Sequence, residues 1–571
     1  MILKSRATSV VAFLILVSVT ASVAQAQQVS NKDSTAGGPT VSAASLRPSF
    51  LTLVTSDDVD RYRADQLLGG VGLGQSMLMR SASSLTPSLR LDGRSWVWDF
   101  IDPQFLVVRN SGMPLSQNNS ALWAGRGIST RTVTGIRVET PFAKITFAPQ
   151  IIASENLFWL QRHNYFQPVT PLNYIGRGYT LPYYFYTFPI DHPLSFGERR
   201  IRNFDLGEST VMVSHRGFEA GASNENNWWG PGIRNAMLLS NNAPGFPHLF
   251  VRTGKPISTP LGGIEMRWLV GKLDESRYFD TLDTNNTRSL AAFAATLQSK
   301  HDPNLTVGVS RSVYATAERW EQIPQRWGDV FRGVTDDNPD ILDQVWQEDS
   351  VPGGRDQLFT LFGRWVFPAS GAEVYGEWGR TRMPKSIGSL LRTPNHTQGY
   401  TIGMQWRGAA WGSATVRFQG EITQLEQSAT FRDGPVGSWY SSNRVIQGYT
   451  NRGQVIGASI GPGASSQFLA ADYMRPTWQV GAFAGRIRWN EDVHGTYGFP
   501  EYVSYCNHDV SVYPGARGSF FSRFGSISAD LALHNRMNVF FQNRGGCPNI
   551  GDRLDLRHTS FKLNFSPSLR W

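Results

Sequence analysis

The last eleven residues of the chain alternate strictly between two kinds of side chain. The apolar positions are Phe561, Leu563, Phe565, Pro567, Leu569 and Trp571, and the polar positions between them are Lys562, Asn564, Ser566, Ser568 and Arg570. Successive side chains of a β-strand point to opposite faces, so this segment has one apolar and one polar face. A strand of this kind separates lipid from a polar lumen, which predicts a transmembrane β-barrel closed by its last strand.

The start of the chain predicts an export signal over residues 1–26. Lys4 and Arg6 precede an apolar stretch from Val10 to Val23, and Ala24-Gln25-Ala26 supplies small residues for cleavage. The apolar stretch is shorter than the roughly 20 residues that a membrane-spanning helix needs, and no comparable stretch follows it. We therefore expect the mature chain to lie in the cell outer membrane and to cross it as strands.

Three regions follow the signal. Residues 27–48 are rich in Ser, Ala, Gly and Gln, which predicts a flexible linker. Residues 49–92 predict a small periplasmic helical element, because Ser56 precedes three acidic residues that suit the first turn of a helix. Residues 93–571 contain one strand-like segment after another, and their number predicts an all-β, antiparallel barrel of about 18 strands.

Two strand-like segments indicate which face meets which environment. In one, the polar residues Arg417, Gln419 and Glu421 alternate with Val416, Phe418 and Ile422. In the other, Arg486 and Arg488 oppose Phe483, Ile487 and Trp489. We expect the charged faces to line the lumen and the hydrocarbon faces to contact lipid. A soluble secreted β-sandwich or propeller is the alternative, and it would bury its apolar face in a core.

The chain is basic, with a formal net charge of +9. The signal carries Lys4 and Arg6 and no acid, so the mature value is 9 minus 2, or +7. Most of the basic residues are arginines, whose planar fork suits carboxylates and phosphates. Acidic glycans and lipopolysaccharide phosphates are therefore the expected partners, and nucleic acid is not. Pairing of lumen arginines with lumen acids is the alternative.

The two cysteines, Cys506 and Cys547, occur in a protein expected to enter an oxidising compartment. Both lie in turn-rich segments at the two ends of a predicted hairpin, which predicts a disulfide between neighbouring loops. Two cysteines with scattered histidines lack the spacing of metal ligands. We expect no metal and no cofactor.

The segment from Asn226 to Leu249 differs from the surrounding strands. Its density of Gly and Pro predicts sharp, irregular backbone, and it places the tandem Trp228-Trp229 among several asparagines. Aromatic plates beside amide groups suit a sugar, which buries its C–H face on a ring while its hydroxyls form hydrogen bonds. The alternative is that these side chains wedge an inward-folded segment against the barrel wall.

Two blocks of this chain resemble the Wzi family of outer-membrane capsule-assembly proteins. The first joins Trp228-Trp229-Gly230-Pro231-Gly232 to the downstream block from Leu239 to Pro247, and the second runs from Gly448 to Gly457. Where the family often carries an acid after Gly461-Pro462, this chain has Gly463-Ala464. The resemblance implies a barrel of about 18 strands with periplasmic helices, a lectin-like protein that holds exported capsular polysaccharide and assists capsule assembly, and no enzymatic activity.

An Arg-rich, aromatic-rich surface can bind an acidic polymer through many weak contacts whose linkage raises the effective concentration. The residues that we expect to bind polysaccharide are Trp228, Trp229, Arg234, Asn241, Asn242, Arg444 and Arg452. We expect a monomer. A passive porin is the alternative function. A hydrolase is disfavoured, because Ser214-His215 and His508-Asp509 are sequence neighbours whose side chains would point to opposite faces of a strand.

Overall fold

The structure is a computed structural model. It describes residues 57–69, 77–159, 190–197, 199–279, 286–317, 319–332, 354–383, 386–428, 437–442, 444–492, 508–539 and 555–568. All of them belong to one compact unit, Ala43–Trp571. The expected export signal, linker and disulfide (Cys506 and Cys547) lie outside the described residues, as does Trp571.

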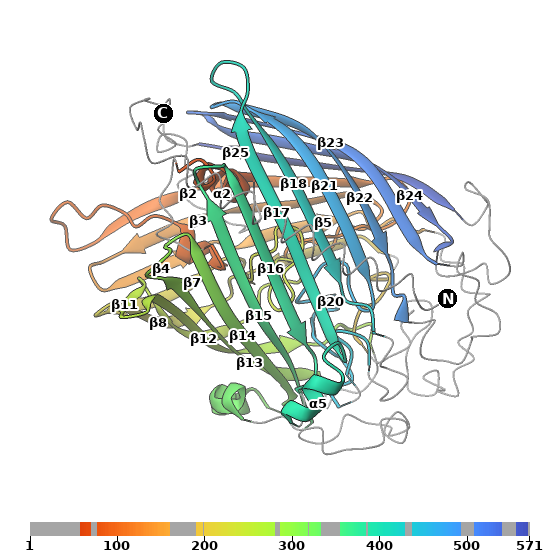
Figure 1. The fold of residues 1–571 in the computed structure, drawn as a ribbon, viewed down its shortest axis with the longest axis horizontal. Helices are drawn as coiled ribbons and strands as arrows, with labels where there is room; N and C mark the ends of the chain where they lie inside the picture. Colours follow the sequence, from red (N-terminus) through yellow and green to blue (C-terminus); the bar gives the residue numbers. More distant parts are fainter. Residues whose placement is uncertain are drawn as a thin grey trace. The chain divides into compact units, whose positions relative to one another are not determined.

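A single closed antiparallel sheet forms the wall of the molecule (Figure 1). Its segments are β2 (Val97–Asn110), β3 (Gly127–Glu139), β4 (Ala143–Phe147), β5 (Gln150–Ser154), β6 (Ile201–Asp205), β7 (Thr210–His215), β8 (Phe218–Ser223), β10 (His248–Thr253), β11 (Ile257–Thr259), β12 (Gly262–Asp274), β13 (Thr287–Ser299), β14 (Leu305–Thr316), β15 (Arg355–Phe367), β16 (Ala372–Arg380), β17 (Gln398–Ala409), β18 (Thr415–Gln424), β21 (Ser465–Met474), β22 (Trp478–Arg488), β23 (Val510–Ser522), β24 (Gly525–Met537) and β25 (Leu556–Pro567).

These 21 segments make 18 strands, because three strands of the wall are interrupted. β3 pairs with both β4 and β5, which pair in turn with β7 and β6, and β12 pairs with both β10 and β11. Counting β4 with β5, β6 with β7 and β10 with β11 subtracts three from 21. The barrel closes where β25 pairs with β2, at Phe565 opposite Phe105. The predicted all-β barrel of about 18 strands, closed by its last strand, is confirmed.

The remaining elements are not part of the wall. They are α2 (Asp57–Gln66), β1 (Met79–Ser81), α3 (Ala82–Leu85), β9 (Asn227–Trp229), η4 (Trp320–Gln322), η5 (Pro324–Phe331), α5 (Ile387–Arg392), β19 (Thr450–Asn451) and β20 (Gln454–Val455). The expected N-terminal helical element is helical in α2 and in the single turn α3, whereas β1 is a strand that pairs with β9. No helix among the described residues is both long and apolar enough to cross a membrane.

The two rims of the barrel differ. At one rim, here called the short-turn rim, β15 joins β16 through residues 368–371 and β21 joins β22 through residues 475–477. At the opposite, long-loop rim the connections are longer, as in residues 155–200 and 489–509. Outer-membrane barrels place short turns in the periplasm and long loops outside the cell.

Helix α2 docks in the mouth at the short-turn rim. The guanidinium of Arg61 donates to the carbonyl of Arg475 at 2.9 Å, and Asp60 pairs with the wall residue Arg417 at 2.8 Å. Burial by itself would raise the pKa of Asp60, but Arg417 and Arg517 lower it below its ordinary value. The helix is therefore fixed to the wall by charges that the sequence places on its turns.

The alternation of side chains works as predicted in β18 and in reverse in β22. Arg417 is fully buried in the lumen, while Phe418 on the opposite face is 51% exposed. In β22, however, Phe483 and Ile487 pack against the apolar core inside the barrel, so Arg486 and Arg488 lie on the outer face. The expectation that these two arginines line the lumen is wrong, because the lumen at this level is filled by protein with apolar side chains.

Candidate ligand-binding site in the lumen

Two segments fold inward and fill much of the lumen. The first is residues 224–247, and the second is residues 437–464, of which 437–442 and 444–464 are described. Together they are called the plug. The carbonyl of Ile456 accepts a hydrogen bond from the amide of Ser240 at 3.0 Å, and the hydroxyl of Tyr440 donates to the carbonyl of Met237 at 2.9 Å. The two sequence blocks that carried the family resemblance are therefore in direct contact, although some 200 residues separate them.

Lumen-facing acids of the wall hold the backbone of the plug. The carboxylate of Glu421 in β18 accepts hydrogen bonds from the amides of Ile233, Arg234 and Asn235 at 2.6, 3.0 and 2.9 Å. Glu377 in β16 accepts one from the amide of Met237 at 3.2 Å. Gly230 has a φ of +114°, and a Cβ there would lie 2.6 Å from a Glu377 oxygen, so only glycine fits. Sequence alternation marked Glu421 as lumen-facing but gave no sign of its partner.

The tandem tryptophans are buried inside the plug. Trp228 and Trp229 are both 0% exposed, and the indole Nε1 of Trp228 donates to the carbonyl of Gly232 at 3.1 Å. Trp229 belongs to the main apolar cluster of the lumen. In this conformation the two rings have no surface free for a sugar, and their arrangement matches the wedge alternative. A direct role for them in binding stays a prediction.

The two predicted asparagines are also buried. Asn241 and Asn242 are 0% and 5% exposed, and the side-chain amide of Asn242 donates to the carbonyl of Val455 at 2.9 Å. The carbonyl of Asn241 accepts the amide of Ser120 at 2.6 Å. They join the two plug segments and the inward loop after β2. Their contact with polysaccharide is likewise untested by this arrangement.

The three predicted arginines lie in different places. Arg452 is half-buried and pairs with Asp205 at 2.6 Å, and Arg444 is half-buried elsewhere in the plug. Arg234 is half-buried, lies with its guanidinium 4.5 Å from the ring of Phe468, and faces a cavity. The structure thus brings only Arg234 of these three to the cavity described next.

A cavity of about 230 Å³ lies between the plug and the wall. It follows the lumen face of β2 and of β21 to β25, and it reaches from Ser526 near the short-turn rim to His534 near the long-loop rim. Those two residues are eight steps apart on β24, which corresponds to about 27 Å along the strand. The cavity is therefore an elongated crevice along one side of the wall.

The lining of the crevice is basic, amide-rich and aromatic. Six basic residues line it against two acids, Asp60 and Asp530. The groups that matter most for a ligand are Arg80, Arg131, Arg234, Asn118, Asn119, Asn235, Phe468 and Phe483. This excess of positive charge favours an anion.

Three of the lining arginines form no ion pair with any carboxylate in the described part of the chain. Arg131 is 3% exposed, its guanidinium donates to the carbonyl of Asn119 at 3.4 Å, and its Nε has no hydrogen-bond partner among the described residues. Arg80 is 3% exposed and donates to the carbonyl of Gly232 at 3.1 Å, and its Nε is also without a partner. Arg234 is the third. Burying a guanidinium without a counter-ion is costly, so an anion in the crevice would be stabilised.

Arg80 is held in place by packing and by its neighbours. Its guanidinium lies 5.2 Å from the ring of Trp228, and the two residues are paired in the β1–β9 ladder. Burial lowers the pKa of Arg80 well below its ordinary value, and the positive charges of Arg63 and Arg364 lower it further. The carboxylates of Glu373 and Glu421 act in the opposite direction. Trp228 acts here as a support for an arginine.

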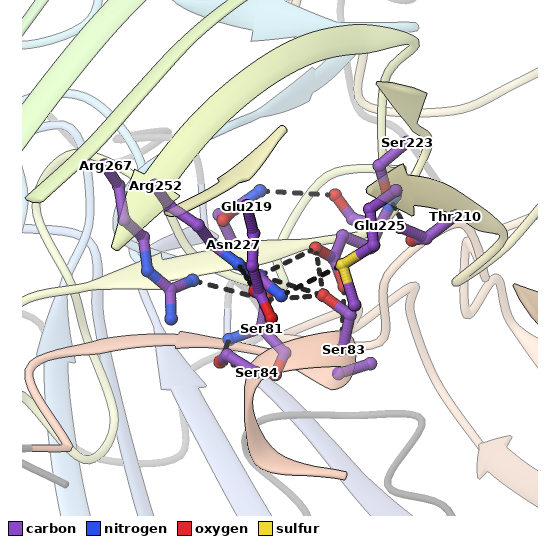
Figure 2. Close-up of polar contacts among 12 residues, drawn as sticks. Ser81, Ser83, Ser84, Thr210, Glu219, Ser223, Glu225, Asn227, Arg252 and Arg267 are labelled. Atoms are coloured by element: carbon purple, nitrogen blue, oxygen red, sulfur yellow. Dashed lines mark hydrogen bonds and ion pairs between the residues drawn. The ribbon is translucent and has the colours of Figure 1, made fainter. Parts of the chain in front are cut away.

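A polar network fixes the segment that carries Arg80 (Figure 2). Ser83 donates its hydroxyl to Glu225 at 2.8 Å and accepts from Arg252 at 2.9 Å. Arg252 pairs with Glu219 at 2.8 Å, and Arg267 donates to the hydroxyl of Ser81 at 3.2 Å. These contacts join β1 and α3 to the plug and to wall strands β8, β10 and β12.

Sequence reasoning missed Arg80 and Arg131. Arg80 precedes a short helix and belongs to no sequence motif. Alternation within β3 could show which face Arg131 occupies. It could not show that Arg131 has no carboxylate partner among the described residues. Whether a lumen arginine has a carboxylate within reach depends on which strands and plug segments meet across the barrel. That information lies only in the three-dimensional structure.

The fold and the lumen define a class: an outer-membrane β-barrel whose lumen is occupied by its own chain. The family model described as "Capsule assembly protein Wzi" matches residues 194–474. Through this segment, about half of its length, the chain belongs to the Wzi capsule assembly family, and the resemblance drawn from the two sequence blocks is confirmed.

A solved structure shares the fold. Wzi of Escherichia coli, described as an outer membrane protein involved in group 1 capsule assembly and as a carbohydrate-binding β-barrel, is 11% identical with a TM-score of 0.50, over 82% of this chain and 85% of that chain. OccK2 of Pseudomonas aeruginosa (8% identity, TM-score 0.36, 82% and 98% covered) and OccAB2 of Acinetobacter baumannii (7%, 0.36, 81% and 97%) are more distant, and nothing about this chain follows from them. No curated protein sequence matches the chain.

Proposed function

We propose that this protein is a lectin-like barrel that holds exported acidic polysaccharide, capsular polysaccharide in particular, at the cell surface and assists capsule assembly. It binds the polymer without chemical change and is not an enzyme. It acts as a monomer surrounded by lipopolysaccharide. Family membership and the description of the Escherichia coli barrel as carbohydrate-binding support this proposal.

One observation carries the choice of an acidic glycan. Arg80, Arg131 and Arg234 line one crevice, and each guanidinium is without a carboxylate partner in the described part of the chain. A sugar carboxylate would accept paired N–H donors from such a group, and charge-assisted hydrogen bonds are about twice as strong as neutral ones. A neutral sugar would leave the same cations buried and uncompensated.

The other lining groups suit the rest of a sugar. Asn118 and Asn119 each have a buried side-chain oxygen that finds no hydrogen-bond partner in the described part of the chain, and such oxygens accept from hydroxyls. Phe468 and Phe483 offer ring faces to C–H groups. A volume of about 230 Å³ matches a short part of a polymer, not a long chain. Retention of a whole polymer would then come from repeated weak engagement of its units.

The residues first expected to bind take four different roles under this proposal. Arg234 contacts the glycan directly, whereas Trp228 supports Arg80 from below. Trp229, Asn241 and Asn242 build the plug that shapes the crevice, and the contributions of Arg444 and Arg452 are made nearer the long loops. All these roles are proposals.

A binding screen with matched polymers tests the function. The refolded protein is titrated with acidic polysaccharides, with neutral ones, and with each acidic polymer after its carboxyl groups have been chemically reduced to alcohols. We expect binding of at least one acidic polymer and at least a tenfold loss on carboxyl reduction. Equal binding of the acidic and reduced forms would refute an acidic glycan, and no binding of any glycan would refute the lectin role.

A passive channel is the second candidate, and the length of the crevice favours it. A crevice that follows about 27 Å of β24 provides a path along which ions could cross. Planar-bilayer recordings separate the two functions. A channel gives a steady open conductance of porin size, whereas a barrel whose plug and α2 stay in place passes little current.

A further inference from the structure

The outer wall carries a cluster of exposed arginines at the long-loop rim. Three are exposed strand residues on the lipid-facing side: Arg109 in β2, Arg202 in β6 and Arg557 in β25. Their strand faces also carry Phe105, which is 39% exposed, and Phe204, which is 58% exposed. Arg126, Arg199 and Arg200 lie at the adjoining rim, and the six are called the outer arginine patch.

The strand register brings these residues together. Arg109 pairs across β2 and β25 with Phe561, four residues from Arg557. Arg202 pairs with Ala153, which is in register with Thr130 and Val107 on the next two strands. Arg202 is therefore three strands from β2 and two residues below the level of Arg109, a separation of about 16 Å between Cα atoms. Long arginine side chains span much of that distance.

The patch has a large excess of positive charge. None of its six arginines forms an ion pair with an acid in the described part of the chain. The acids of the same stretches of sequence are Glu155, Glu198 and Asp555. The carboxylate of Glu155 accepts the amide of Ile128 at 2.7 Å, and that of Asp555 accepts the amide of Asn538 at 3.2 Å. The adjoining residues 160–189 contain no Asp or Glu. Six arginines against three acids leave a net charge of +3.

Apolar groups border the patch. Leu157 and Phe158 are 46% and 67% exposed, and the guanidinium of Arg126 donates to the carbonyl of Phe158 at 2.5 Å. Cations placed beside exposed apolar side chains, on the outer wall and at the extracellular rim, match a molecule that has acyl chains below and phosphate above. Free sugar polymers lack the first feature.

We propose that the outer arginine patch binds the phosphate groups of a phosphorylated glycolipid of the outer leaflet. Bidentate guanidinium–phosphate hydrogen bonds give such a site its specificity. The site lies on the outside of the wall and the crevice on the inside. The inference rests on the membrane location alone and does not depend on the polysaccharide proposal.

The test uses lipid A with both phosphates and lipid A from which the phosphates have been removed. Native mass spectrometry of the detergent-solubilised full chain measures binding to each. The variant replaces Arg109, Arg202 and Arg557 with Gln. The matched control replaces Lys255, Arg475 and Arg523, which are exposed at the short-turn rim, with Gln. It therefore loses as many positive charges as the patch variant.

We expect the control to bind phosphorylated lipid A as the wild type does, and the patch variant to bind it on the order of 100-fold more weakly, since each surface arginine near an anionic headgroup contributes about fivefold. The Arg→Lys triple variant should lose less than the Gln variant. Heat-modifiable migration and strand-type circular dichroism verify folding.

Three results would overturn the inference: equal binding by the patch variant, an equal loss in the control, or equal binding of dephosphorylated lipid A. Displacement of the lipid by millimolar inorganic phosphate would overturn the lipid assignment in favour of a free anion. A failure of polysaccharide binding with intact lipid A binding would count against the proposed function and leave this site standing.

Discussion

Replacing Arg131 with Met should weaken binding of an acidic glycan and stabilise the empty protein. Arg131 is 3% exposed, and its guanidinium has a carbonyl at 3.4 Å and no carboxylate partner among the described residues. Methionine keeps much of the length of the side chain and removes the charge. The two effects have opposite signs, so one variant tests the reasoning twice.

The size of the binding effect follows from the bond that is lost. A hydrogen bond to a charged group contributes about 1.5 to 3 kcal/mol, which corresponds to a factor of about 10 to 150 in affinity. The stability effect follows from desolvation. Replacing buried charge with well-packed apolar groups is neutral or stabilising, by about 1 to 4 kcal/mol where it has been measured.

Arg267→Met is the matched control. Arg267 is a half-buried lumen arginine that donates to the hydroxyl of Ser81 at 3.2 Å. It forms no ion pair with a carboxylate of the described residues, and it does not line the crevice. Both variants and the wild type are titrated by calorimetry with an acidic oligosaccharide and with its carboxyl-reduced form, and their thermal unfolding is followed in detergent. Wild-type affinity of the Arg131 variant for the acidic form would refute the role of the crevice. Equal losses in both variants would refute a specific contact.

Three further predictions concern the plug and its supports. Trp228→Ala should lower stability by about 3 to 5 kcal/mol, because a fully buried indole is removed, and a variant as heat-resistant as the wild type would contradict the burial seen here. Arg63→Met should release α2 and raise single-channel conductance, because Arg63 pairs with buried Glu373 at 2.7 Å and breaking such a pair costs about 3 kcal/mol. If both the conductance and the protease resistance stay unchanged, α2 does not close the mouth of the barrel. Burial raises the pKa of Asp492 from 3.8 to about 7, so the folded protein holds this proton more tightly than the unfolded chain and stability falls as pH rises through that window. This fall amounts to at most about 1.4 kcal/mol per pH unit, and the Asp492→Asn variant should not show it. Amide hydrogen exchange measures the stability of both proteins against pH, and identical profiles for wild type and variant would exclude the effect.

Much of the wall could be predicted from the sequence. The alternation in Phe561–Asn564 placed Lys562 and Asn564 on the lumen side, where both line the crevice. The same rule placed Arg417 inward and Phe418 outward, as observed. Period-two alternation is local, so it can be read wherever lipid covers one face. The dense Gly and Pro of residues 226–249 predicted sharp, irregular backbone, and this segment contains only the three-residue strand β9 before β10 begins at His248.

The candidate site could be predicted only in part. Arg234 was named from its neighbourhood, but Arg80 and Arg131 were not, and the tandem Trp228-Trp229 is buried. A residue pattern indicates which groups occur together along the chain. It does not indicate whether a ring is covered or whether a guanidinium finds a carboxylate, because both depend on contacts between segments far apart in sequence.

The sequence by itself determined that the chain forms an all-β wall with one face for lipid, since hydrophobic alternation acts over a few residues and needs no knowledge of partners. The tertiary structure decided what occupies the lumen. Because the plug fills it with apolar side chains, Phe483 and Ile487 face inward and Arg486 faces outward, against the expectation of a polar interior. Packing across the barrel also left three arginines beside one crevice without an ion pair to any carboxylate of the described residues, and burial of unpaired charge is a property of the assembled molecule alone.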